Sequence, residues 1–422
     1  MPAGRVRGQK AWPTAIETER NEDPDMTKPL DGVRVLDLTN VLAGPFACHQ
    51  LAHLGAEVIK VEAVGRGDLA RNLGADPDLS AKGMGISFLA QNAGKKSLTL
   101  NLKDPRGKDV LKRLVAGADV LVENFRPGVM DRLGLGYEVL KAEAPHLIYC
   151  AISGFGQDGP WAHRPAYDQI VQGASGVMSI TGDAESAPLR VGYPLADTVG
   201  GLTAAMAICA SLNASERGAF IDVSMLESVL ATMGWVVSNH LIGGVAPKPN
   251  GNENPTSAPS GAFQCSDGLI NIAANKDEQW ELLAKHLGRE DLVGHADFAS
   301  REDRKHNRLR LKAELETVLT TRPAREWARE LNKLGVPAGA VLSVPEVLDH
   351  PQIRDRDFLA RFDETPGVGK PIDLLRIGAM IDGTRPSVDT PPPALGADTD
   401  RILTALGYAA EDIKTLRKEN VV

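Results

Sequence analysis

One aspartate stands where a helix is expected to begin, and it could serve as a carboxylate nucleophile. Asp197 precedes a run of small and apolar residues that predicts a helix as far as Leu212. An aspartate in this place is typical of a helix N-cap, which is its purely structural interpretation. The positive end of the helix would also keep the carboxylate ionised, and the N–H groups of Gly200 and Gly201 could stabilise an oxyanion. The segment therefore predicts a helix cap or a nucleophile for covalent acyl transfer.

A glycine-rich motif suggests a second chemistry, but its context argues against it. The stretch from Gly154 to Gly159 has the G-x-G-x-x-G spacing of a dinucleotide-binding turn and follows a predicted strand. Such a turn has to open a helix whose N-terminus meets the pyrophosphate. Here Pro160 and Pro165 follow, and a proline in a helix interior breaks the helix. We therefore interpret the motif as a loop, which leaves a nicotinamide-dependent oxidoreductase as a disfavoured alternative.

The elements that must position these residues alternate between strand and helix. Buried-strand patterns at 33–38 and 58–61 flank a predicted helix at 45–54, which has Pro45 in its first turn. Repeated strand–helix–strand spacing predicts an α/β fold with a mostly parallel sheet and helices on both faces. The further elements that we expect are strands at 97–102, 120–122, 147–152, 220–223 and 269–273, and helices at 105–115, 225–242 and 411–418.

Two domains, or one large domain with an appendage, are expected, because 422 residues exceed the size at which one hydrophobic core usually keeps growing. The Gly- and Pro-rich stretch 243–261 is long enough to be an active-site loop, and 335–339 is a plausible hinge. The predicted ranges are a disordered leader at 1–28, the first part of a large Rossmann-like domain at 29–224, a linker helix with a smaller α+β domain at 225–340, and a return segment at 341–422 that completes the large domain.

Composition and charge exclude several classes of partner. The net charge is −8, and the basic residues are spread along the chain, which argues against a nucleic-acid groove or an anionic membrane surface. The longest apolar run, 202–212, is too short to span a bilayer. The four cysteines lie far apart without a C-x-x-C pair, so that neither a metal site nor a disulfide framework is indicated. We expect a cytoplasmic protein.

Five ordered blocks carry a resemblance to one family that extends from about Pro29 to Val422. The chain is similar to the class III CoA-transferases, a family that includes formyl-CoA transferase, carnitine CoA-transferase and α-methylacyl-CoA racemase. Five blocks in order are far more specific than any single motif. The matching blocks are Leu36–Pro45, Leu54–Glu62, Leu98–Lys103, Val122–Gly128 and Leu395–Thr399.

The resemblance implies a reaction and an assembly. Asp197, which follows Leu195 and Ala196, occupies the place of the family's nucleophile. The enzyme would move CoA from an acyl-CoA to a carboxylic acid through an aspartyl anhydride and an aspartyl-CoA thioester, with no permanently bound cofactor. The family also implies an interlocked, ring-like homodimer. Small dicarboxylates such as succinate are the acceptors we expect.

A racemase of the same fold is the main alternative. In the racemases the aspartate works with a histidine thirty positions upstream, and Tyr167 stands there in this chain. Tyrosine, with an unperturbed pKa of about 10, is a poor acid or base near neutral pH. Transfer is therefore favoured, while Asp168 could act as a base or orient its loop at a helix start. A catalytically silent CoA-binding protein is disfavoured because Asp197 is retained.

The resemblance also implies CoA contacts. The loop at 40–43 would run along the pantetheine, and it precedes a helix whose N-terminus can receive phosphate. Formyl-CoA transferase has a basic residue where this chain has Ala63, for which Arg66 or Arg71 could compensate. It also covers its intermediates with consecutive glycines, whereas this chain has 254–261, so a formyl or oxalate substrate is not implied. The expected CoA-binding residues are Val41, Leu42, Ala43, Arg71, Leu100, Lys103, Asn124 and Arg132, although Lys103 and Arg132 could equally be solvated surface charges.

Overall fold

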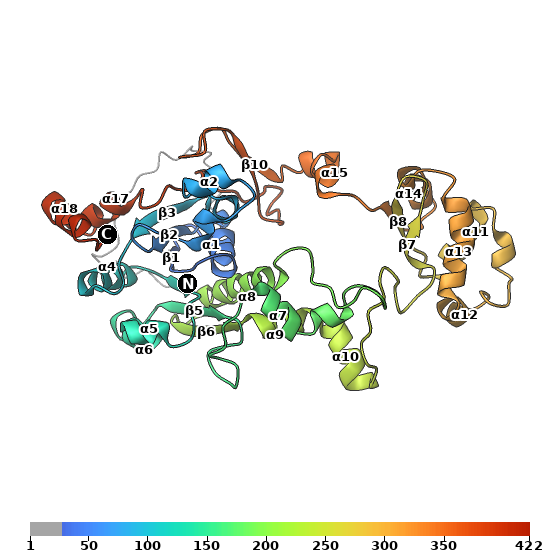
Figure 1. Cartoon of the computed structure of the whole chain (residues 1–422), viewed down its shortest axis with the longest axis horizontal. Helices are drawn as coiled ribbons and strands as arrows, with labels where there is room; N and C mark the ends of the chain where they lie inside the picture. The colour runs from blue at the N-terminus through green and yellow to red at the C-terminus, as the bar shows by residue number, and fades with distance from the viewer. Residues whose placement is uncertain (1–27) are drawn as a thin grey trace. The chain divides into compact units, whose positions relative to one another are not determined.

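The computed structural model describes residues 28–422, which fold into two units (Figure 1). The first unit comprises the chain as far as Val177, residues 191–237 and residues 356–422. The second comprises residues 178–190 and 238–355, so it ends later than the range predicted for the small domain. The predicted leader lies outside the described residues except for Lys28, whose ammonium donates to the Ser387 carbonyl at 2.9 Å. Residue 28 therefore belongs to the fold.

The first unit is built on six parallel strands. Their order is β3-β2-β1-β4-β5-β6, which is the order of a dinucleotide-type doubly wound sheet and confirms the predicted α/β class. The third strand begins two residues before its predicted start. The prediction from apolar residues did not include the charged Lys95, which is nevertheless buried in this strand. The strands are β1 (Arg34–Asp37), β2 (Glu57–Glu62), β3 (Lys95–Thr99), β4 (Val120–Glu123), β5 (Ile148–Ser153) and β6 (Ala219–Ser224).

Helices cover both faces of this sheet. The reversal of strand order after β3 places the crossover helix α4 (Pro105–Val115) on the face opposite α1 (Ala43–His53). On the α4 side, apolar residues of the strands, of α4 and of the C-terminal helices α17 (Thr399–Ala405) and α18 (Ala410–Lys418) share one core. On the α1 side, α1 lies next to α8 (Leu195–Leu212) (Figure 1). The C-terminal helices α17 and α18 thus belong to the same core as the N-terminal strands.

The long apolar helix predicted at 225–242 is two helices. These are α9 (Met225–Thr232) and α10 (Gly234–Gly243), which are separated at Met233. A glycine weakens a helix interior because it has the most backbone freedom to lose. The first unit further contains η1 (Leu69–Asn72), α2 (Pro77–Ala81), α3 (Ile86–Asn92), α5 (Val129–Leu133), α6 (Tyr137–Glu143), α7 (Asp168–Ala174), β10 (Leu359–Phe362) and β11 (Ile372–Leu375).

The second unit packs an antiparallel sheet, ordered β7-β8-β9, against helices around its own core. The segment predicted as a hinge at 335–339 is corrected, because it leads into β9 (Ala338–Ala340), which pairs with β8 (Leu269–Ala273). Small residues such as Ala-Gly-Ala carry no apolar alternation that would predict a strand. The other elements are η2 (Val177–Ile180), which starts at the unit boundary, β7 (Ser260–Gln264), α11 (Asp277–His286), η3 (Glu290–Leu292), α12 (Arg301–His306), α13 (Arg308–Leu319), α14 (Ala324–Lys333), α15 (Val344–Leu348) and α16 (Pro351–Arg354).

Candidate active site

Asp197 lies in the first turn of α8 and does not cap it. The helix begins at Leu195, and its N-cap residue is Pro194, which has no side-chain acceptor. The cap is supplied by Asp168, whose Oδ1 accepts the N–H of Ala196 at 2.8 Å and the N–H of Asp197 at 3.4 Å. The predicted N-cap role therefore belongs to Asp168, which stands at the start of a different helix, α7.

A second side chain of α7 completes this arrangement. Gln172 donates from Nε2 to Asp168 Oδ2 at 2.7 Å and to the Tyr193 carbonyl at 3.2 Å. Its Oε1 accepts the N–H of Val191 at 2.9 Å. Asp168 and Gln172 thus hold the segment that leads into α8 in place. This agrees with the orienting role considered for Asp168. Sequence reasoning missed Gln172, whose only signal is its place one helical turn after Asp168.

The surroundings of Asp197 favour its neutral form. Burial raises the pKa of the Asp197 carboxyl to about 7, and the negative charge of Asp168 adds to the effect. The expectation that the helix end keeps Asp197 ionised is corrected, because Asp197 lies inside the first turn instead of at the cap, and burial together with the charge of Asp168 disfavours its ionised form. A carboxyl group that titrates near neutral pH is typical of a catalytic group.

Gly200 and Gly201 pack α8 against its neighbours. Both lie inside the helix, where their N–H groups bond to carbonyls one turn earlier, so their expected role as oxyanion donors is corrected. A methyl group on Gly200 would lie 2.8 Å from Cγ of Met225, and one on Gly201 would lie 2.6 Å from the carbonyl oxygen of Ala43. This close approach brings the start of α1 against α8, one turn after Asp197 and on the same side of the helix.

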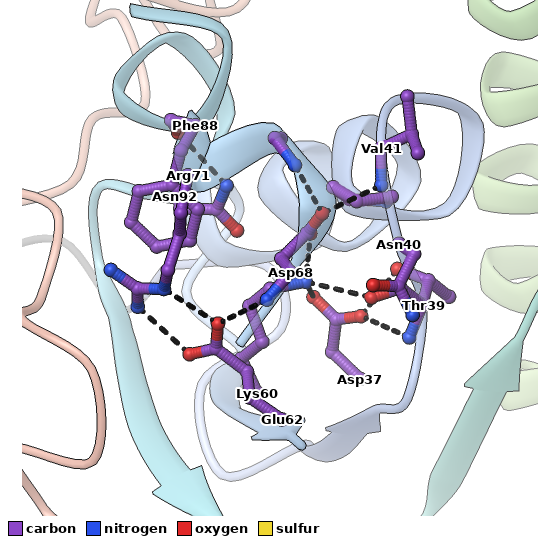
Figure 2. Close-up of polar contacts among 12 residues, drawn as sticks. Asp37, Thr39, Asn40, Val41, Lys60, Glu62, Asp68, Arg71, Phe88 and Asn92 are labelled. Atoms are coloured by element: carbon purple, nitrogen blue, oxygen red, sulfur yellow. Dashed lines mark hydrogen bonds and ion pairs between the residues drawn. The ribbon is translucent and has the colours of Figure 1, made fainter. Parts of the chain in front are cut away.

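The loop before α1 has a firmly held backbone (Figure 2). The Asn124 side chain accepts the N–H of Asn40 through Oδ1 and donates to the Asn40 carbonyl through Nδ2, both at 2.8 Å. Val41 adopts a left-handed conformation with φ of 67°, and its N–H donates to Asp68 Oδ1 at 2.9 Å. Of the expected CoA contacts, Val41 and Leu42 are partly exposed and Ala43 is buried, whereas Asn124 braces the loop.

The remaining expected contacts are scattered. Leu100 is 2 % exposed and packs in the core, so its side chain does not reach a surface. Arg71 is 1 % exposed, its guanidinium is bonded to both oxygens of Glu62, and it lies 3.7 Å from the centre of the Phe88 ring. Lys103 and Arg132 are exposed, and so is Tyr167. The structure therefore brings Asp168 to the first turn of α8, which holds Asp197, and the start of α1 to Gly201 in the next turn. Arg71 forms a buried ion pair with Glu62.

The sequence model of CoA-transferase family III matches residues 30–399. The chain belongs to this family. It is 39% identical over 388 residues to the succinyl-CoA:glutarate CoA-transferase of Mus musculus, covering 90% of this chain and 87% of that protein. It is 42% identical over 350 residues to the acetyl-CoA:oxalate CoA-transferase of Acetobacter aceti, covering 82% and 89%. A solved structure of a CAIB/BAIF family protein from Brucella suis superposes with a TM-score of 0.79 at 35% identity, covering 90% of this chain and 100% of that one. The chain is a CoA-transferase.

Asp168→Asn should change the pH dependence of this CoA-transferase. The substitution removes the negative charge beside Asp197 and keeps an oxygen that can accept the N–H of Ala196. Because that charge helps to raise the pKa of Asp197 to about 7, we expect the acid limb of kcat/KM near pH 7 in wild type and at a lower pH in the variant. The measurement is kcat/KM against pH for one acyl-CoA. Gln172→Leu, which leaves the charge, is the matched control and should keep the limb in place. An unmoved limb in Asp168→Asn would contradict the electrostatic role.

Proposed function

We propose that this CoA-transferase exchanges CoA between small dicarboxylic acids with Asp197 as its covalent nucleophile. The observation that carries the proposal is the carboxyl group of Asp197, which has a pKa of about 7 and lies one helical turn from the contact between α8 and the start of α1. At neutral pH a large fraction of this group is ionised, and its ionised form is poorly solvated, which favours attack on a carbonyl carbon.

The reaction proceeds by two pairs of displacements. The Asp197 carboxylate attacks the thioester carbonyl of the donor and expels CoA thiolate, which leaves a mixed anhydride. The thiolate attacks the aspartyl carbonyl, which releases the donor acid and forms an aspartyl-CoA thioester. The acceptor carboxylate then attacks this thioester, and the expelled thiolate attacks the acceptor half of the new anhydride, which regenerates Asp197. Thioester and anhydride are close in energy, so the protein has to supply positioning and oxyanion stabilisation.

We assign the oxyanion donors to the first backbone N–H groups of α1 instead of those of Gly200 and Gly201. The first turn of α1 has no side-chain cap, which leaves N–H groups at Ala43 and Gly44 without an intrahelical acceptor. The same turn contacts α8 beside Gly201. A helix N-terminus carries a partial positive charge, which suits a tetrahedral oxyanion or a phosphate.

The acceptor class comes from the relatives. The proteins from Mus musculus and Acetobacter aceti are named for glutarate and oxalate, both dicarboxylates, and for succinyl-CoA and acetyl-CoA as donors. A screen should therefore offer these two donors with oxalate, succinate, glutarate and a monocarboxylate such as butyrate. Mass spectrometry of the CoA products is expected to show transfer to a dicarboxylate in preference to butyrate. Transfer to butyrate alone would contradict the proposed acceptor class.

The racemase alternative is tested by solvent deuterium. A racemase has to remove and return the α-proton of a 2-methylacyl-CoA, so deuterium from the solvent must enter the acyl chain as fast as it turns over. Tyr167, in the place of the racemase histidine, is 67 % exposed. We expect CoA exchange with negligible deuterium incorporation. Rapid incorporation without CoA transfer would make Asp168 and Asp197 an acid–base pair and overturn the transferase mechanism.

The phosphates of CoA require cations that are free of protein carboxylates. Arg66 and Lys82 line a pocket of about 330 Å³ in the first unit, and neither forms an ion pair with a described residue. Lys103 and Arg132 are also exposed without such a pair, which keeps them as candidates from the resemblance. Because Arg71 is engaged by Glu62, we assign to Arg66 the compensation for Ala63.

Alanine variants of these four cations should separate ligands from surface charges. A residue that contacts a CoA phosphate should raise the KM for acyl-CoA by about one to two orders of magnitude, since a charge-assisted hydrogen bond contributes about 1.5–3 kcal/mol. We expect this rise in KM for Arg66→Ala, Lys82→Ala, Lys103→Ala and Arg132→Ala. Lys418→Ala, an exposed lysine of α18, is the control. Four unchanged KM values would contradict both assignments.

A homodimer, interlocked as the resemblance implies, is part of the proposal. One described helix, α8, is long and apolar enough by composition to cross a membrane, yet it packs against α1 and α9. Large apolar side chains remain exposed on α8, α9 and α10, and we propose that the partner subunit covers them. They are Leu202 and Met206 on α8, Leu230 on α9 and Trp235 on α10. Light scattering should give twice the 45.0 kDa of one chain, and the mass of a single chain would contradict the dimer.

A further inference from the structure

A cluster of charged side chains is buried beneath the loop before α1. Its members come from β1, β2, β3 and the start of η1, and all are at most 4 % exposed. Burying charges costs solvation free energy that their mutual attraction does not reliably return, so such a cluster is weak evidence of a purely stabilising role. We call it the buried charge cluster, and it consists of Asp37, Lys60, Glu62, Asp68 and Lys95.

The cluster holds the backbone of the loop (Figure 2). Asp37 Oδ1 accepts the N–H of Thr39 at 3.0 Å, and Lys60 Nζ donates to the Thr39 carbonyl at 2.8 Å. Asp68 Oδ1 accepts the N–H of Val41 at 2.9 Å. Together with Asn124, these contacts satisfy the backbone groups that the loop turns towards the protein interior.

Lys60 connects the two aspartates. Its ammonium lies 2.9 Å from Asp68 Oδ2 and 3.8 Å from Asp37 Oδ2. Burial acts to lower the pKa of Lys60, but the charges of Asp37 and Asp68 outweigh it, so the pKa lies above its ordinary value and the side chain stays cationic. Asp68 is fixed from its other side by Glu62, whose Oε2 accepts the backbone N–H of Asp68 at 3.0 Å.

The conformation of Val41 requires this support. A β-branched residue at φ of 67° is strained, and such strain persists only where the surroundings over-determine the backbone. Glycine would adopt this conformation without strain. Strained backbone of this kind is concentrated at active sites and ligand contacts. The bond from Val41 to Asp68, and the ion pair that orients Asp68, are the contacts that oppose relaxation of this residue.

We propose that Lys60 and Asp68 are positioning residues for the acyl-CoA, because they hold Val41 left-handed and so direct the loop's exposed edge and the start of α1 towards the substrate. The inference rests on the proposed function, which places the substrate along this loop. Neither residue is accessible to the substrate, so neither touches a reacting atom. Their loss should therefore weaken substrate binding while the nucleophile Asp197 remains in place.

Lys60→Met and Asp68→Asn test the proposal in the full-length enzyme. Methionine retains the length of Lys60 without its charge, and asparagine retains an oxygen for Val41 but loses the ion pair with Lys60. We expect each to raise the KM for succinyl-CoA, or the donor that the screen identifies, by 10- to 100-fold while kcat changes by less than about threefold. Hydroxylamine trapping at Asp197 at saturating donor should be retained. Asp68→Asn keeps the test open if Lys60→Met does not fold.

Lys96→Met is the control. Lys96 lies in the same strand, β3, and its ammonium forms an ion pair at 2.5 Å with Glu57, which is not part of the buried charge cluster. Lys95 does not serve, because its ammonium donates to the Pro45 carbonyl in the first turn of α1 at 2.9 Å. Lys96→Met should leave the KM unchanged. An equal rise in KM for Lys96→Met, or unchanged KM in both test variants, would overturn the positioning role. Adding Val41→Gly to Asp68→Asn should recover part of the lost affinity, because glycine adopts this φ unaided. A wild-type enzyme without CoA transfer would instead refute the proposed function.

Discussion

Asp197→Asn is expected to lower the kcat for CoA transfer by about three orders of magnitude or more. The side-chain amide has nearly the shape of the carboxyl group but is a poor nucleophile, so neither the mixed anhydride nor the aspartyl thioester can form. Loss of a covalent nucleophile is among the largest effects a single substitution has on an enzyme. Transfer is measured as the appearance of a new acyl-CoA by mass spectrometry. Wild type incubated with acyl-CoA and hydroxylamine should be modified on the peptide that contains Asp197.

Two further variants sharpen this test. Asp197→Ala cannot regain the carboxylate by deamidation, so it should show the same loss. Tyr167→Phe alters the exposed neighbour of Asp168 without touching the nucleophile, and it should retain kcat within a fewfold. Near-wild-type turnover in Asp197→Ala, with the chain folded, would exclude Asp197 as the nucleophile.

The sheet was predictable because its signals are local. Strands such as β4 and β5 are mostly continuous apolar runs, which are typical of strands buried on both faces of a sheet. Turn residues separate these strands from the helices. The start of β3 escaped prediction because Lys95 is stabilised there by Asp37, a partner 58 positions earlier in the chain. β9 escaped because its three small residues become a strand only when β8 is alongside.

The choice of Asp197 as the candidate nucleophile is a prediction from the sequence, whereas its electrostatics come from the structure. Asp197 was found from its place at a helix start and from the family resemblance. Its raised pKa could not be inferred, because it depends first on the burial of the carboxyl group and then on the charge of Asp168, which lies on another helix. Arg71 was predicted to contact CoA because its interaction partner within the protein could not be seen from the sequence. Only the fold reveals that Glu62 occupies its guanidinium.

The same electrostatics predict that Asp197→Asn gains stability as it loses activity. The folded state raises the pKa of Asp197 from 3.8 to about 7, so folded wild type binds more protons than the unfolded chain between those values. The contribution of the neutral Asp197 carboxyl to the stability of wild type is therefore fully present below pH 4, and it is lost as the pH rises through about 7. Asparagine does not ionise and avoids this loss. At pH 8 the free energy of unfolding of the variant should exceed that of wild type by about 2–4 kcal/mol. This figure takes about 1.36 kcal/mol for each pKa unit and allows for partial solvation of the carboxyl group.

The pH dependence of this gain distinguishes it from a general effect of the substitution. Thermal midpoints of variant and wild type should differ by several degrees at pH 8 and converge towards pH 4, at equal protein concentration because assembly shifts apparent stability. His53, whose pKa is lowered by burial to about 4, titrates in the same range but in both proteins, so it cancels from the difference. Asp31→Asn, at an exposed aspartate of the same unit, should show no such trend. A difference that stays constant from pH 4 to pH 8 would mean that the fold does not raise the pKa of Asp197, and the acid limb expected near pH 7 in kcat/KM would then need another origin.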